Sequence, residues 1–209
     1  MRVLLTGFEP FGGSAINPSE QVVQALSSSP INGLEIYPAV LPVDYQAGPR
    51  TLLAALEEIK PQAVLCLGEA ARRAVVSVER VAVNLLDFSI PDNAGAQMVD
   101  QPIITAGPAA YFATLPVRKI VHNIRAAGVP VELSLSAGSY LCNQVLYTLL
   151  HQLNIQGLSK TPAGFIHLPS LPEQTAQQKS AAPSMALETS LRAVRAALET
   201  LLEKDEVNP

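Results

Sequence analysis

The sequence has few of the side chains that form metal sites or disulfide-stabilised folds. Its 209 residues include no tryptophan, two cysteines and three histidines. The two cysteines, Cys66 and Cys142, are too few for a disulfide framework, and no Cys-x-x-Cys or similar zinc-ligand spacing occurs. We therefore expect reduced thiols in a cytoplasmic protein, and no metal ion or other cofactor.

Charged side chains are also scarce, at 15% of the chain compared with about 25% in an average soluble protein. The 14 basic and 18 acidic residues give a net charge of -4, and no cluster of Lys and Arg follows one predicted face. A nucleic-acid partner is therefore not expected. The hydrophobic share of 48% lies at the upper end of the usual range, which favours apolar surface covered by another subunit.

Long apolar runs are absent as well. The first 13 residues contain one arginine and an apolar run much shorter than the core of a signal peptide. No stretch approaches the roughly 18 apolar residues that a membrane-spanning helix needs. We expect a chain that is neither exported by a Sec-type signal nor inserted into a membrane.

Short aliphatic runs alternate with segments of helical periodicity through the first 86 residues. The predicted strands are residues 2–7, 34–42, 63–68 and 74–86, and the predicted helices between them are residues 17–26 and 51–60. The first helix has Asn17 as its predicted N-cap and Pro18 at its first position. The alternation predicts an α/β fold, a three-layer α/β/α sandwich around a mixed, largely parallel twisted sheet, as a single domain over residues 1–209.

The second half of the chain is less regular. Residues 87–108 contain Pro, Gly, Asn and Asp without periodicity, and they predict a long loop of the kind that is usually functional. Residues 109–128 are predicted to be helical with a break at Pro116. The remaining predicted elements are a strand at 129–134, a helix that begins near Cys142, a strand at 163–169 and a helix at 184–203.

Cys142 lies where a predicted strand gives way, through small residues, to a predicted helix. Four leucines between residues 146 and 153 recur at helical spacing after it. At the start of a helix, unpaired backbone N–H groups and the positive end of the helix dipole favour an anion. Cys142 is therefore placed where a thiol could become a thiolate, whereas Cys66, within AVLCLG, is interpreted as a small apolar core residue.

A reactive cysteine needs a base and usually a third group that orients the base. His122 and His151 lie within predicted helices, where a solvated or capping role is expected. His167 ends a buried-looking strand, where ligand sites gather in open α/β sheets, although a structural histidine is an equal alternative. Glu79 is a charged residue within a Val-rich strand, where it needs a partner. The alternative for Glu79 is an exposed Glu79–Arg80 pair on an edge strand.

The segment TGFEPFGG, residues 6–13, follows the first predicted strand. It does not match a phosphate-binding loop, because Pro10 intervenes and no Gly-Lys-Ser/Thr follows. A loop with glycines and two rings, Phe8 and Phe11, instead favours a small apolar pocket.

Several segments resemble, in order and spacing, the pyroglutamyl peptidases of type I, also called pyrrolidone-carboxylate peptidases. They extend from the N-terminus to about Met185 and comprise TGFEPFGG with NPS behind it, ERVAVN, IPDNAG, GPAAYFATLP, SAGSYLCN, GFIHLPSLPEQ and APSM. The resemblance implies a cytoplasmic cysteine peptidase, a hydrolase that removes N-terminal pyroglutamate from peptides and forms homodimers or homotetramers.

By this resemblance, Cys142 corresponds to the nucleophile, His167 to the base and Glu79 to the acid that orients the base. These are the three residues that their positions also single out. A Cys142 thiolate would attack the carbonyl that joins pyroglutamate to the next residue, and water would hydrolyse the resulting thioester. The residues that match the family's substrate pocket are Phe8, Phe11, Ile90, Tyr140 and Leu141.

The chain departs from the family pattern at two positions that we also assign to the substrate site. Where the family usually reads GQAGGR this chain reads GEAARR, so that Glu69 replaces Gln. We expect Arg72 to neutralise the added carboxylate. Ser89 replaces an arginine that is thought to help stabilise the oxyanion, and its presence predicts a slow enzyme.

Two other functions are compatible with these residues. One is a cysteine hydrolase that keeps the three catalytic groups and acts on another cyclic amide or an acyl substrate. The other is a silent protein that binds pyroglutamyl ends without cutting them, although such a protein would have no need of all three groups.

Overall fold

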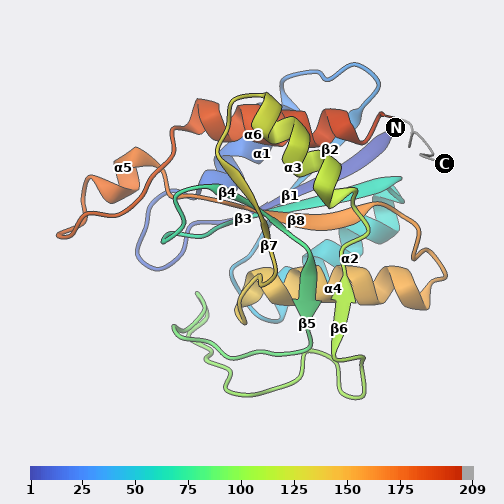
Figure 1. Ribbon diagram of the computed structural model, residues 1–209. Coiled ribbons are helices and arrows are strands. Elements are labelled where there is room, and N and C mark those ends of the chain that lie inside the picture. Colours follow the sequence, from blue (N-terminus) through green and yellow to red (C-terminus); the bar gives the residue numbers. More distant parts are fainter. Residues whose placement is uncertain (204–209) are drawn as a thin grey trace.

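The computed structural model describes residues 1–203, and in that range six strands form one twisted sheet between two layers of helices (Figure 1). The order across the sheet is β2-β1-β3-β8-β4-β7. In chain order the strands are β1 (Arg2–Phe8), β2 (Glu35–Leu41), β3 (Ala63–Glu69), β4 (Val76–Glu79), β7 (Val131–Ser134) and β8 (Ala163–Leu168). All neighbouring pairs are parallel except β4 and β8, which are antiparallel. The predicted mixed, largely parallel α/β/α sandwich is confirmed.

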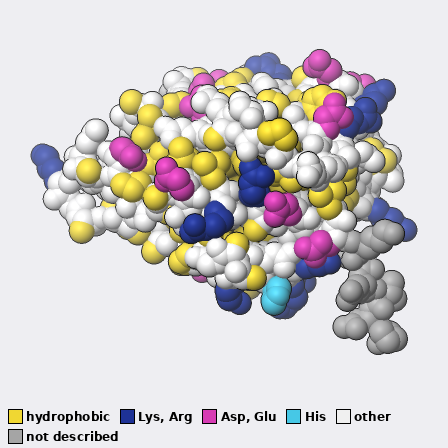
Figure 2. Space-filling view, turned by 90° about the horizontal axis from the view of Figure 1, so that it is seen from above, with side chains coloured by type: hydrophobic (Ala, Val, Ile, Leu, Met, Phe, Trp, Pro, Cys, Tyr) yellow, Lys and Arg dark blue, Asp and Glu magenta, His cyan; other side chains and the backbone are white. Residues whose placement is uncertain are grey.

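Helices cover both faces of this sheet. One layer contains α1 (Pro18–Ser27), α3 (Val117–Ala126) and α6 (Leu187–Thr200), and the other contains α2 (Ala47–Ile59) and α4 (Leu141–Ile155) (Figure 1). A short helix, α5 (Pro172–Thr175), follows β8. Figure 2 views the face formed by α1, α3 and α6, on which acidic and basic side chains are scattered singly among apolar and polar ones. A concentrated basic patch of the kind that binds nucleic acid is absent from this face.

The central strands are buried on both sides, which is why their sequences are continuous apolar runs rather than alternating ones. In β1, Val3 and Leu5 pack into the cluster beneath α1, α3 and α6, whereas Leu4 packs into the cluster beneath α2 and α4. The first helix begins as predicted, because the side chain of Asn17 accepts a hydrogen bond from the backbone N–H of Ser19 at 2.9 Å. Because β1, β3 and β8 are parallel, their carboxyl ends lie together at one edge of the sheet.

The predicted single strand at 74–86 is wrong, because the chain leaves the sheet after Glu79. The backbone N–H of Arg80 donates to Ser134 of β7, and the carbonyl of Arg80 accepts from Ala113. Residues beyond this point form β5 (Val81–Val83), which pairs with β6 (Ala110–Phe112) in a separate two-stranded sheet. This small sheet packs against α4, away from the central sheet (Figure 1).

The predicted helix at 109–128 begins later than expected. Residues 110–112 form β6, and the helix α3 starts at Val117 directly after Pro116. A short run of apolar and aromatic residues is compatible with either a helix or a strand. Residues 110–112 form a strand because they pair with β5.

The segment between β5 and β6, residues 84–109, contains no helix or strand, and it holds the predicted loop at 87–108. Its backbone is anchored by polar side chains, including Asn84, whose amide accepts from the N–H of Ile104 and donates to its carbonyl, both at 2.9 Å. Among residues 1–203, no helix has the length and apolar character needed to span a lipid bilayer.

Candidate active site

Cys142 and His167 both lie near Gly68, at the carboxyl ends of β3 and β8. His167 is the penultimate residue of β8, and its partner in the parallel register is Gly68 of β3. Cys142 is the second residue of α4 and is half-buried. A Cβ atom added to Gly68 would lie 2.8 Å from the Cys142 sulfur and 2.7 Å from the ring of Phe165. The absent side chain of Gly68 thus lets the start of α4 approach the sheet beside His167.

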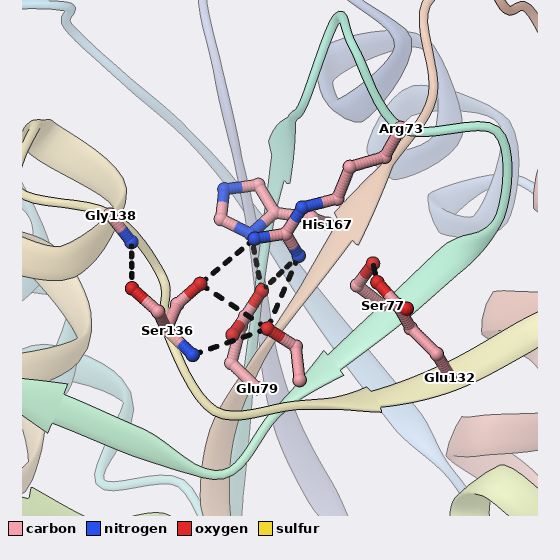
Figure 3. Close-up of polar contacts among 8 residues, drawn as sticks. Arg73, Ser77, Glu79, Glu132, Ser136, Gly138 and His167 are labelled. Atoms are coloured by element: carbon pink, nitrogen blue, oxygen red, sulfur yellow. Dashed lines mark hydrogen bonds and ion pairs between the residues drawn. The ribbon is translucent and has the colours of Figure 1, made fainter.

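Glu79 and His167 form a buried hydrogen-bonded pair (Figure 3). Glu79 ends β4, which runs antiparallel to β8, and its register partner is Phe165. Residues at alternate positions of a strand share a face, so Glu79, Phe165 and His167 lie on the same side of the sheet. His167 Nδ1 lies 2.8 Å from Glu79 Oε1, with 0% of Glu79 and 4% of His167 exposed. The alternative of an exposed Glu79–Arg80 pair on an edge strand is wrong, since Glu79 is fully buried.

The carboxylate of Glu79 determines the tautomer of the imidazole. Burial raises the pKa of Glu79, but the hydrogen bond and charge of His167, together with Ser134 and Arg73, outweigh burial and hold this pKa below its usual value. An ionised carboxylate can only accept hydrogen bonds. His167 therefore donates through Nδ1, and Nε2 is the nitrogen that can accept a proton.

Arg73 completes the charge arrangement, and sequence analysis missed it. It lies between β3 and β4, and its Nη1 is 2.6 Å from Glu79 Oε1 (Figure 3). Its Nη2 donates to the carbonyl of Ser136 at 2.8 Å, which ties the turn to the segment after β7. Arg80, the neighbour of Glu79 in the sequence, instead stacks over the ring of Phe112 at 5.8 Å. A buried glutamate required a cation, but sequence alone did not identify which arginine supplied it.

The surroundings of Cys142 favour the protonated thiol. Burial and, to a smaller extent, the carboxylates of Glu79 and Glu69 raise the pKa of Cys142 to about 12, whereas Arg73 opposes this shift. Burial and the two carboxylates thus work against the thiolate that the start of α4 and Arg73 favour. Burial also raises the pKa of Cys66 to about 12, and Cys66 lies in the apolar core as predicted.

A small pocket opens beside Cys142. Five of the residues assigned to the substrate site line it together with Asn17 and Val43, namely Phe8, Phe11, Glu69, Tyr140 and Leu141. The ring centroids of Phe11 and Tyr140 are 6.4 Å apart. A larger hollow between the far ends of α2 and α4 contains no cysteine or histidine. Of these two pockets, the smaller one is therefore lined by a candidate nucleophile, Cys142.

Two of the assigned residues, Ser89 and Ile90, do not line this pocket. Both are exposed in the loop between β5 and β6. The same loop nevertheless reaches the pocket wall, because Asn93 donates to Glu9 Oε1 at 2.9 Å and to the carbonyl of Pro10 at 3.0 Å. The structure thus gives Ser89 no direct place beside Cys142.

Asn143 anchors the start of α4, and sequence analysis missed this residue too. It is fully buried, and its side chain accepts from the N–H of Val83 and donates to the carbonyls of Val83 and Leu85. These bonds fix α4 to β5 immediately beside Cys142. An asparagine after the cysteine is the signal that was present in the sequence, but its partners are 58 and 60 positions away.

Glu69 has partners other than the expected one. Ser170 Oγ donates to Glu69 Oε1 at 2.6 Å, and Gln174 Nε2 lies 3.1 Å from both carboxylate oxygens. Arg72 is exposed and makes no ion pair with Glu69. The expected neutralisation of Glu69 by Arg72 is wrong, because Ser170 and Gln174 hold the carboxylate while Arg72 is exposed and forms no ion pair with it.

The amino-acid sequence is similar to one family of known proteins over nearly its whole length. Residues 1–204 match the family model for pyroglutamyl peptidase. The pyrrolidone-carboxylate peptidase of Gloeobacter violaceus is 49% identical over 209 residues, which cover 99% of this chain and 100% of that protein. The pyrrolidone-carboxylate peptidase of Yersinia pestis is 46% identical over 202 residues, covering 97% and 93%.

Solved structures agree with these relatives. A variant of the pyrrolidone carboxyl peptidase of Pyrococcus furiosus superposes with a TM-score of 0.93 at 43% identity, covering 97% of this chain and 98% of that one. The pyroglutamyl peptidase I of Bacillus amyloliquefaciens gives a TM-score of 0.90 at 37% identity, covering 95% of each chain.

Proposed function

The chain belongs to the pyroglutamyl peptidase family, and from this premise we propose that it is a cysteine peptidase that removes N-terminal pyroglutamate from peptides. The observation that supports the catalytic assignment is the contact of Glu79 with His167 Nδ1, beside the pocket that Cys142 lines. We assign Cys142 as the nucleophile, His167 as the base and Glu79 as the acid that orients the base.

The first step joins proton transfer to attack. Because burial and the carboxylates of Glu79 and Glu69 raise the pKa of the Cys142 thiol, we infer that the thiol keeps its proton until attack. His167 Nε2 takes the thiol proton as the sulfur attacks the carbonyl carbon after pyroglutamate. The imidazolium then gives this proton to the leaving amine, and the C–N bond breaks to leave a thioester. Water, deprotonated by His167, hydrolyses the thioester and frees pyroglutamate and Cys142.

The charged groups on the Nδ1 side of His167, Glu79 and Arg73, support these proton transfers. Glu79 stabilises the imidazolium that forms during attack, as the acid of such a triad does. Arg73 contacts the same oxygen of Glu79 as His167 does. Its positive charge therefore weakens the stabilisation that Glu79 gives to the protonated ring of His167. The backbone N–H groups in the first turn of α4 supply dipoles for the oxyanion, since Ser89 is outside the pocket.

The pocket supports a neutral ring as its ligand. Pyroglutamate has its amino group locked in a lactam, so it presents no ammonium group. Phe8 and Phe11 offer apolar walls, and the carboxylate of Glu69 can accept the lactam N–H.

The cellular setting is part of the same proposal. The nucleophile must remain a free thiol, which favours the cytoplasm. A homodimer or homotetramer is supported by apolar side chains exposed around the small β5–β6 sheet, with Phe112 69% and Val99 64% exposed.

The test is release of a chromophore from a pyroglutamyl amide, compared with the open-chain glutamyl amide. The pyroglutamyl amide should be cleaved far faster, because the glutamyl side chain brings a carboxylate that must lose water beside Phe8, Phe11 and Glu69. Equal rates for the two amides would contradict the pocket assignment. Folded protein that cleaves neither amide would contradict the proposed function itself.

A further inference from the structure

Asn143 follows Cys142 directly in the first turn of α4, and its side chain is fully buried. The side-chain oxygen accepts a hydrogen bond from the N–H of Val83 at 2.9 Å. The amide nitrogen donates to the carbonyl of Val83 at 2.8 Å and to the carbonyl of Leu85 at 3.1 Å. Both hydrogens of this nitrogen are therefore used on β5 and the residues after it, which holds the side chain in one orientation.

The segment that binds Asn143 continues the strand that carries Glu79. β4 ends at Glu79, and a single residue, Arg80, separates it from β5. The N–H of Arg80 donates to the last residue of β7, and the carbonyl of Arg80 accepts from the residue after β6, both at 2.9 Å. Four residues of chain span at most about 14 Å, so Val83 stays close to Glu79. The anchor of Asn143 is thus fixed relative to the acid that contacts His167.

Ser139 binds the same stretch of chain from the other side of Cys142. Its hydroxyl donates to the carbonyl of Asp87 at 2.6 Å, and its carbonyl accepts from the N–H of Asp87 at 3.0 Å. Within the described chain, the N-cap residue Tyr140 supplies no side-chain hydrogen bond to the first turn of α4. Asparagine has a low helix propensity, so local preference does not explain Asn143 in this turn. Its tertiary hydrogen bonds to residues 83–85 do.

We propose that Asn143 is a positioning residue of the reaction, assisted by Ser139, and that it sets the place of the Cys142 sulfur relative to His167. This inference rests on the proposed function, because it takes Cys142 as the nucleophile and His167 as the base. Residues 83–87 hold the turn that carries the sulfur. The preceding residue in the same extended path, Glu79, holds His167 Nδ1 at 2.8 Å (Figure 3). A displacement of about 1 Å between reacting groups can cost roughly 100-fold in rate.

Asn84 offers a matched control, because it makes the same kinds of hydrogen bond elsewhere. Its side chain accepts from the N–H of Ile104 at 2.9 Å and donates to the carbonyls of Ile104 at 2.9 Å and Gly107 at 3.3 Å. These bonds anchor the loop between β5 and β6 rather than the start of α4. Their loss should lower stability without displacing Cys142.

The experiment measures kcat and KM on a pyroglutamyl amide for Asn143→Ala and Asn84→Ala, with activities corrected for the folded fraction. We expect Asn143→Ala to lower kcat by about 10- to 100-fold. KM should change by less than about threefold, because Phe8, Phe11 and Val43 line the pocket from other elements. Asn84→Ala should keep kcat within about threefold of the unmodified protein. Urea unfolding of both variants compares their losses of stability.

Ser139→Ala tests the same inference with a milder change, so that the test does not depend on the folding of Asn143→Ala. It removes the hydroxyl bond to Asp87 and leaves the backbone bond in place. We expect kcat to fall by about three- to tenfold, which corresponds to the loss of one hydrogen bond. The matched control is Ser27→Ala, which removes an exposed hydroxyl bond to the carbonyl of Gln24 on α1 and should leave kcat unchanged.

The outcomes separate this inference from the proposed function. A fall in kcat for Asn143→Ala and Ser139→Ala, but not for Asn84→Ala, supports the inference. Folded Asn143→Ala with unchanged kcat overturns it, and so does an equal fall in kcat for Asn84→Ala. If Asn143→Ala does not fold, unchanged kcat in Ser139→Ala overturns it. Folded, unmodified protein that fails to cleave the pyroglutamyl amide overturns the proposed function instead.

Discussion

The guanidinium of Arg73 lies 2.6 Å from the carboxylate of Glu79, on the same oxygen that the ring of His167 contacts at 2.8 Å. Glu79 is fully buried, whereas 28% of the Arg73 side chain is exposed. One buried carboxylate thus contacts a permanently charged guanidinium and an imidazole that gains its charge during the proposed attack. The arrangement neutralises Glu79 in part while leaving it able to orient the imidazole.

Arg73→Gln tests this arrangement. We expect kcat on a pyroglutamyl amide to fall by about 10- to 100-fold, because Glu79 and His167 lose their alignment with Cys142. The acid limb of the pH profile of kcat/KM should also move to higher pH. A fully charged Glu79 stabilises the protonated imidazole, which cannot accept the thiol proton. A purely structural role for Arg73 would lower activity without moving this limb.

The matched control for Arg73→Gln is Arg72→Gln, the same change at an exposed neighbour. It should alter neither kcat nor the pH profile. Arg73→Lys should restore part of the activity, since it keeps the charge but loses the second bond to the carbonyl of Ser136. The loss of stability in Arg73→Gln should stay below the about 3–5 kcal/mol typical of a fully buried pair, because Arg73 is partly exposed.

Gly68→Ala tests the close approach of α4 to the sheet. The added methyl would meet the Cys142 sulfur at 2.8 Å and the ring of Phe165 at 2.7 Å, so at least one of them must move. We expect a loss of stability of about 1–3 kcal/mol, measured by urea unfolding, and a fall in kcat of at least about tenfold. Unchanged kcat in folded Gly68→Ala would show that the position of the sulfur is not critical.

The two cysteines should respond differently to substitution. Cys142→Ser should reduce kcat by about 10³-fold or more without loss of the fold, because His167 cannot activate a hydroxyl as it activates a thiol. Cys66→Ser should lower stability by about 1–3 kcal/mol, since it buries a hydroxyl in the apolar core, while activity per folded molecule persists. Activity assays corrected for the folded fraction distinguish the two. The reverse pattern would contradict the assignment of Cys142.

The pH dependence of thiol labelling tests the protonation state of Cys142. In the Cys66→Ser background, the rate of alkylation by iodoacetamide without substrate should increase continuously from about pH 7 to about pH 10, since only the thiolate reacts. The pKa of about 12 lies above this range, so no plateau is expected within it. A plateau near neutral pH would instead indicate a stable thiolate–imidazolium pair.

The sequence by itself determined most of the elements and the candidate catalytic residues that they carry. Helical spacing after Cys142 and the apolar run before His167 are local patterns, and local patterns determine where a helix starts and where a buried strand ends. The capping of α1 by Asn17 is equally local. The α/β fold followed from the alternation of such patterns along the chain, because aliphatic runs and amphipathic segments can bury their apolar surfaces together only in layers.

Tertiary structure alone decided how these residues are paired. The antiparallel register of β4 and β8 brings Glu79 to His167 across 88 positions of sequence, and the turn after β3 supplies Arg73 rather than Arg80 as the cation. Residues 110–112 became a strand because β5 was available to pair with them. The carboxylate of Glu69 accepts hydrogen bonds from Ser170 and Gln174 and forms no ion pair with Arg72. Periodicity describes which face of an element is apolar, but it contains no information about which distant polar group will satisfy a buried charge, and that choice depends on register and packing.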